Sequence, residues 1–180
     1  MRFQPELQAL APWIAAFGIT PQTRILTPTG QRAARDLQIG DMVETRDHGP
    51  QPIANIREAF AAPSERNHFP VCIAQGALGF GLPHSDLNVG PQHRVLFEHI
   101  RVPLMFGADA VLVRAKSLAV SHPNVKVVRA KIPVSYIQIS LAEQHILFAE
   151  GVPIESIMPE GECDLGYMTL RSWELMVAVA

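Results

Sequence analysis

Histidines are the side chains of this chain best suited to proton transfer or metal binding, and the sequence contains seven of them. They are His48, His68, His84, His93, His99, His122 and His145. No two are spaced as H-x-x-x-H, and there is no paired-cysteine motif, so the sequence does not indicate a metal-dependent hydrolase. The phosphate loops G-x-x-x-x-G-K-[ST] and G-x-G-x-x-G are absent as well. We therefore expect neither a metal nor another cofactor.

Two of the histidines stand beside apolar stretches. His93 follows a Pro-Gln pair and precedes Val95-Leu96-Phe97, and His145 lies within LAEQHILF. Each could be a structural histidine held by hydrogen bonds, and each could be a proton donor at a reacting bond. The choice depends on the elements that position them.

Those elements are expected to be short strands. Runs of β-branched and apolar residues occur at 24–27, 42–46, 52–60, 71–74, 94–98, 110–115, 125–130 and 134–141. Turn signals made of Pro, Gly, Asn and Asp separate these runs. The pattern predicts an all-β protein.

Helix is expected only in short pieces. Apolar residues recur at helical spacing over 5–16, although Pro12 interrupts the pattern, and one turn of helix is expected at each of 33–37 and 114–119. The last two pieces suggest an internal duplication. The sequence Thr23-Arg24-Ile25-Leu26 leads to the first, and His93-Arg94-Val95-Leu96 leads to the second. The match is too short to prove a repeat by itself.

Four separated segments carry longer motifs: ITPQTRILTPTGQRAARDLQIGDMVETRDHGPQPI (19–53), VGPQHRVL (89–96), VLVRAKSL (111–118) and YIQISLAEQHILFAEG (136–151). Together they resemble the Hint (Hedgehog/intein) domain family. The first is similar to the signature L-x-x-G-D-x-V-x-T-R-D-H-G-P-Q-P of a bacterial Hint subtype. The resemblance implies a horseshoe of two β subdomains related by a pseudo-twofold axis, with few short helices.

The resemblance also implies an autoprocessing site. A Cys or Ser before the T-x-x-T stretch attacks the preceding carbonyl in this family, and that position falls on Gly18, so the attacked bond would be Phe17-Gly18. His93 falls at the histidine that protonates the departing nitrogen. The hydroxyl that steadies the intermediate falls on Gly90, and His145 falls at a further site histidine.

Other residues do not replace the missing groups. Thr20 is the hydroxyl nearest to Gly18, but two residues of displacement put it about 6–7 Å along an extended chain, beside the wrong peptide bond. Glu155 and Ser156 stand where inteins end in His-Asn. Neither can form a succinimide, so splicing is excluded, and the bacterial subtype shares this ending.

We expect three parts: an extein-like, partly helical N-terminal extension (1–17), a Hint-like domain (18–160) and a C-terminal tail packed on it (161–180). The extension is the one partner implied, as an intramolecular substrate. With 15 basic and 17 acidic residues, the chain has no electrostatic reason to bind nucleic acid or an anionic membrane. Oligomeric state is not indicated.

The compartment is expected to be cytoplasmic for the chain as given, because no apolar run approaches the roughly 20 residues that span a bilayer and no secretory signal is present. The resemblance leaves export open if the chain belongs to a larger secreted protein. We expect Cys72 and Cys163 to be two unpaired thiols, although a disulfide between them is possible.

Two functional hypotheses follow. The chain is an autoprocessing scaffold, inactive as given because residue 18 carries no nucleophile, or a degenerate Hint domain that acts as a binding or structural module. Both predict that Gly18 and His93 meet in one site. The first also predicts that Gly18→Cys restores thiol-dependent cleavage after Phe17 and that Gly90→Thr raises its rate.

Overall fold

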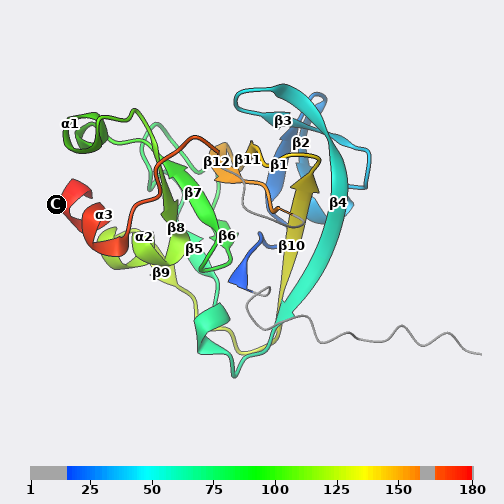
Figure 1. The fold of residues 1–180 in the computed structure, drawn as a ribbon. Helices are drawn as coiled ribbons and strands as arrows, with labels where there is room; N and C mark the ends of the chain where they lie inside the picture. The colour runs from blue at the N-terminus through cyan, green and yellow to red at the C-terminus, as the bar shows by residue number, and fades with distance from the viewer. Residues whose placement is uncertain (1–15, 159–164, 180) are drawn as a thin grey trace, which may run out of the picture.

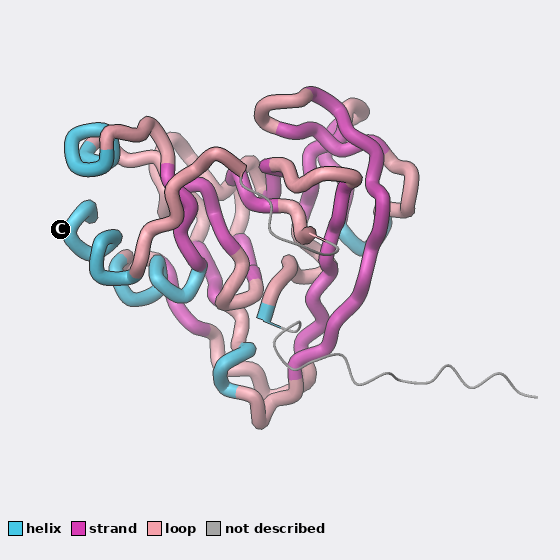
Figure 2. Tube along the Cα trace, viewed as in Figure 1, coloured by secondary structure: helices cyan, strands magenta, loops and turns pink. Residues whose placement is uncertain are grey.

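The structure is a computed structural model that describes residues 16–158 and 165–179. Most of the elements are strands: β1 (Arg24–Thr27), β2 (Gly30–Ala33), β3 (Met42–Thr45), β4 (Gly49–Ala61), β5 (Val71–Ile73), β6 (Leu87–Val89), β7 (Arg94–Phe97), β8 (Val111–Arg114), β9 (Val125–Val127), β10 (Val134–Leu141), β11 (Ile146–Ala149) and β12 (Val152–Glu155). The helices are short: η2 (Ala34–Asp36), η3 (Arg66–His68), α1 (Arg101–Phe106), α2 (Ala115–Ser121) and α3 (Ser172–Val179). The all-β fold class predicted from the sequence is confirmed. Figure 2 shows that α1, α2 and α3 gather on one side of the molecule.

The strands form two sheets. The larger has the order β10-β4-β3-β11-β12-β7-β8, with β1 on β11 and β2 on β1, and the smaller has the order β6-β5-β9. In Figure 1 the long antiparallel pair β4 and β10 forms one arm, β7 and β8 with the helices form the other, and β11 and β12 lie between them. This is the horseshoe that the sequence predicted.

One apolar core runs through both arms. Every residue of β10 from Tyr136 to Leu141 is buried, because one face of this strand packs on the core and the other is covered by the N-terminal segment and neighbouring loops. Ile25, Val95, Ile137 and Ile154 belong to the same core cluster, although they lie far apart in the sequence. The core therefore fixes the strands that surround the candidate site.

Matched hydrogen bonds confirm the internal duplication. The Ala34 N–H donates to the Thr23 carbonyl at 2.8 Å, and the Ala115 N–H donates to the His93 carbonyl at 2.9 Å. Each bond joins the residue before a short strand to the first turn of the helical piece that follows the strand pair. Thr23 and His93 therefore occupy equivalent positions in the two halves.

A pair of buried glutamates follows the same symmetry. Glu150 accepts hydrogen bonds from the Arg24 backbone N–H at 2.7 Å and lies 3.5 Å from its guanidinium. Glu155 accepts from the Arg94 N–H at 2.9 Å and from its guanidinium at 2.6 Å. Glu150 lies in the turn between β11 and β12 and Glu155 is the last residue of β12, so the two glutamates tie each half of the duplication to this central hairpin.

The expected strands are all present. The ends of β1 and β10 are as predicted and those of the other six are shifted, but four further strands were missed: β2, β6, β11 and β12. The piece at 33–37 is a 3-10 turn instead of α-helix, and the piece at 114–119 is α2. Helix α1 was not expected. The helix expected at 5–16 lies outside the described residues, except for its last position.

The described part of the tail lies against the second arm. Thr169 bridges to Leu112 of β8, and Leu170, Leu175 and Ala178 are buried. Among residues 16–158 and 165–179, no helix is both long and apolar enough to cross a membrane.

Candidate functional site

Residues 16–20 cross the centre of the molecule, with bends at Phe17 and Gly18 before the isolated bridge at Ile19. Ile19 bridges Val89 of β6 on one side and Ile137 of β10 on the other, and its N–H and carbonyl bond to Ile137 at 3.0 and 2.7 Å. Next along the chain, the Thr20 N–H donates to the Asn88 carbonyl at 3.1 Å. The segment is thus held on both edges, and it joins the two sheets.

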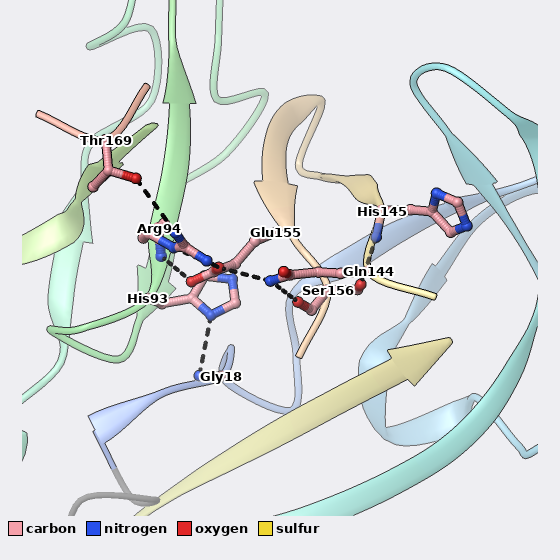
Figure 3. Close-up of polar contacts among 8 residues, drawn as sticks. All are labelled: Gly18, His93, Arg94, Gln144, His145, Glu155, Ser156 and Thr169. Carbon is pink, nitrogen blue, oxygen red and sulfur yellow. Dashed lines mark hydrogen bonds and ion pairs between the residues drawn. The ribbon is translucent and has the colours of Figure 1, made fainter. Parts of the chain in front are cut away.

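The Phe17-Gly18 peptide bond lies between two side chains. The Gly18 N–H donates to Nδ1 of His93 at 3.3 Å, although the two residues are 75 positions apart. Gln138 Nε2 donates to the Phe17 carbonyl at 3.2 Å. The prediction that Gly18 and His93 meet in one site is confirmed, and the contact between these two residues is drawn in Figure 3.

His93 is held as a neutral acceptor. Its side chain is buried, and this burial lowers the pKa of His93. The charge of Arg94 lowers the pKa further, and the Glu155 carboxylate raises it by less than burial lowers it. Because Nδ1 accepts from Gly18, the ring proton must sit on Nε2. In this state Nδ1 has no proton to give to the amide nitrogen.

No side chain fits at residue 18 in this conformation. Gly18 has φ +109°, which L side chains rarely adopt, and a Cβ would lie 2.7 Å from the Ile137 carbonyl oxygen. That oxygen is fixed because it accepts the Ile19 N–H. Gly18→Cys would therefore require the backbone at residue 18 or β10 to shift, and restored cleavage in that variant stays a prediction.

Gly90 is equally confined. A Cβ there would collide with the Ala16 carbonyl oxygen and lie 2.7 Å from its carbon and 3.0 Å from the Phe17 carbonyl carbon. The Gly90 N–H donates to the Gly18 carbonyl at 2.8 Å, and the Gln92 N–H donates to the Ala16 carbonyl at 2.9 Å. The upstream segment therefore fills the volume that a threonine or serine side chain would need.

Glu155 forms a buried polar cluster behind His93. Its carboxylate is 3% exposed and accepts from the Arg94 N–H, the Arg94 guanidinium and, at 3.1 Å, Gln144 Nε2. Arg94 Nη1 also donates to the Thr169 hydroxyl at 3.3 Å, which links the site to the tail. Figure 3 shows the His93 ring between Gly18 and this carboxylate.

His145 lies elsewhere. Its ring centroid is 4.7 Å from that of His48 in the β3–β4 turn, and its backbone exchanges bonds with Ser156, at 2.9 Å to Oγ and 2.8 Å from the Ser156 N–H. Burial, and then the neighbouring His48, lower the pKa of His145. In Figure 3 its ring points away from His93. The structure brings together Gly18, Gly90 and His93 but not His145.

Sequence reasoning missed Gln138 as a contact of the Phe17 carbonyl. Its signal was a lone amide in the apolar strand VSYIQISL, where a buried polar group needs hydrogen-bond partners. The Thr20 hydroxyl lies 3.1 Å from that of Thr23. Within the described ranges, no group of three or more metal-ligating side chains occurs, and Cys72 is a free thiol. Cys163 lies outside those ranges.

Comparisons with known proteins agree with this geometry. A family model described as Hint domain matches residues 17–161. A splice-inactive variant of the AceL NrdHF class 3 split intein superposes with a TM-score of 0.53 at 13% identity, covering 78% of this chain and 99% of that one. A bacterial intein-like domain from Clostridium thermocellum gives a TM-score of 0.53 at 13% identity, covering 78% and 97%. A search of curated proteins found no match.

Proposed function

From the premise that this chain belongs to the Hint domain family, we propose that its self-cleavage site works as a clamp. The domain holds residues 16–20 where the family holds its own substrate, and it leaves the Phe17-Gly18 bond intact. Its role is then that of a binding or structural module that fixes the segment upstream of residue 21.

The single observation that carries this proposal is the lack of space at both glycines. At residue 18 the obstacle is the Ile137 carbonyl oxygen, and at residue 90 it is the backbone of Ala16 and Phe17. A site that had lost only a nucleophile would keep room for one. Here the backbone of the held segment and of β10 fills both positions, so the glycines support tight binding of the segment.

The contacts on the peptide bond support holding over cutting. A tethered thiol or hydroxyl would have to attack the Phe17 carbonyl, and the leaving nitrogen would need a proton. Gln138 donates to that carbonyl and could polarise it. His93 Nδ1, however, accepts a hydrogen bond from the Gly18 N–H, and burial keeps the ring neutral. His93 therefore stabilises the intact amide.

A second candidate function is latent autoprocessing. The observation that favours it is that both ends of the Phe17-Gly18 amide have a side-chain contact. His93 contacts the Gly18 N–H and Gln138 contacts the Phe17 carbonyl. Under this alternative, the backbone shifts to admit a cysteine at residue 18, and thiol-dependent cleavage after Phe17 follows.

Mass spectrometry of the purified chain distinguishes the two. The clamp predicts an intact chain after days with dithiothreitol or hydroxylamine, and an intact chain for Gly18→Cys and for Gly18→Cys/Gly90→Thr. Gly30→Cys is the matched control for an added thiol, because Gly30 has a similar φ of +113° and open space around it. A fragment that begins at residue 18 in the unaltered chain refutes the clamp. The same fragment from a folded Gly18→Cys variant, lost again on His93→Ala, favours latent autoprocessing.

A further inference from the structure

A small cavity lies beside His93. Its volume is about 10 Å³, which is about the smallest that holds one water molecule. Six isoleucine and leucine side chains form most of its wall, and His93 and Glu155 are the only polar residues among its lining. A cavity with two facing polar groups differs from the purely apolar voids that stay dry.

His93 brings an unused donor to this cavity. Nε2 is buried and has no hydrogen-bond partner among the described residues. It must carry the ring proton, because Nδ1 accepts the Gly18 N–H. Buried donors are almost always satisfied in folded proteins, by protein groups or by ordered water.

Glu155 brings an unused acceptor. Its Oε2 receives Arg94 Nε, Arg94 Nη2 and Gln144 Nε2, whereas its Oε1 receives only the Arg94 backbone N–H. A carboxylate oxygen can accept two hydrogen bonds, so Oε1 retains one. Donor and acceptor thus line the same cavity without touching each other.

We propose that this cavity is a built site for one water molecule that accepts from His93 Nε2–H and donates to the Glu155 carboxylate. Glu155 then acts as a positioning residue. Through the water it holds the His93 proton on Nε2 and leaves Nδ1 free to accept the Gly18 N–H. The inference rests on the proposed clamp, whose hold on the Phe17-Gly18 bond depends on this tautomer.

The internal duplication supplies a matched control. Glu150 holds the Arg24 backbone and guanidinium as Glu155 holds those of Arg94, but the residue equivalent to His93 in that half is Thr23. Glu150→Gln therefore removes the charge of an equivalent buried carboxylate whose side-chain partners are Arg24 and Ser85, and which does not line the cavity at His93.

The test is 15N NMR of histidine-labelled full chain, with His93 assigned through its backbone, together with a crystal structure. We expect Nδ1 unprotonated and Nε2 protonated, with an ordered water between Nε2 and Glu155. In Glu155→Gln the Nε2 proton should exchange with solvent roughly tenfold faster or more, because its bridge to the carboxylate is lost. Glu150→Gln should leave both the His93 resonances and this rate unchanged.

Three results would overturn the water site: a His93 protonated on Nδ1, a direct bond between Nε2 and Glu155 with no water, or equal His93 exchange rates in Glu155→Gln and the unaltered chain. The intact mass of the same samples is measured in parallel. A chain cut after Phe17 refutes the clamp, whereas an uncut chain with the wrong tautomer refutes the water site alone.

Discussion

Gly90 lies directly against the carbonyl group of Ala16, so close that a Cβ on residue 90 would come within 2.7 Å of the Ala16 carbonyl carbon. The residue therefore serves packing: it lets the upstream segment approach β6 closely enough for the Gly90 N–H to reach the Gly18 carbonyl. Gly18 makes the corresponding approach to β10 on the other side. Close backbone packing at these two glycines thus holds the upstream segment between Gly90 and β10.

Gly90→Ala should lower the free energy of unfolding by about 1–3 kcal/mol, because the methyl group must displace backbone that is itself hydrogen-bonded. Urea denaturation followed by circular dichroism measures the change. A loss below about 0.5 kcal/mol would mean that the upstream segment moves aside freely, and the close approach would not be a constraint.

Gly18→Ala should lower the free energy of unfolding by more than Gly30→Ala does. Both residues have similar positive φ, +109° and +113°, so each substitution carries a conformational cost of about 1–2 kcal/mol. Only residue 18 adds a contact with the Ile137 oxygen, whereas a Cβ on residue 30 meets nothing within 4 Å. The difference between the two unfolding free energies isolates this contact, and equal losses would contradict it.

Stability should fall on acidification through the titration of His93. Burial lowers the folded-state pKa of His93 below its ordinary value of 6.5, so below about pH 6.5 the unfolded chain takes up a proton that the folded chain does not. The stabilisation is complete above that pH and is lost as pH falls towards the folded-state pKa, by at most about 1.4 kcal/mol per pH unit.

Unfolding free energies at pH 7.5, 6.5 and 5.5 measure this slope. Burial also lowers the pKa of His122 and His145, so part of the slope belongs to them. The His93→Gln variant keeps an acceptor for the Gly18 N–H and should have a shallower slope. Identical slopes in the two proteins would show that His93 is protonated to the same extent in the folded and unfolded states.

Arg94→Ala should destabilise the chain more than Arg24→Ala. Removing Arg94 leaves the Glu155 carboxylate, 3% exposed, without its cation, at a cost of about 3 kcal/mol for a broken buried pair. The Arg24 side chain is 51% exposed against 29% for Arg94, so water can replace it more readily at Glu150. Thermal or urea unfolding measures the loss of stability in each variant. A larger loss for Arg24→Ala would show that solvent exposure does not determine how much each ion pair contributes.

The strand pattern was predictable because buried strands need β-branched and apolar residues in short runs. The strands that were missed are short, and not all carry such a signal. Strand β2 is the polar run GQRA, which lies at the outer end of the path through β1, whereas β11 is the apolar run ILFA inside the longer 136–151 motif. Pairing partners supply what those segments lack in propensity.

The candidate site was predictable in part. Family motifs named Gly18, Gly90 and His93, and the fold brings these three together. The same motifs named His145, which packs on His48 instead. Gln138 was not predicted, because its contact with the Phe17 carbonyl depends on where the upstream segment packs against β10, and only the fold determines that.

The sequence by itself determined that this protein is all-β and that residue 18 can supply no nucleophile, since these follow from residue types and their order along the chain. It suggested a duplicated strand and turn without proving it. Only the tertiary structure decided whether the site has room for a nucleophile. That depends on the distances from Gly18 to the Ile137 oxygen and from Gly90 to the Ala16 backbone, which involve three segments brought together by the packing of the two sheets. Local sequence does not encode a distance of that kind, because it is fixed by the close packing of the whole core.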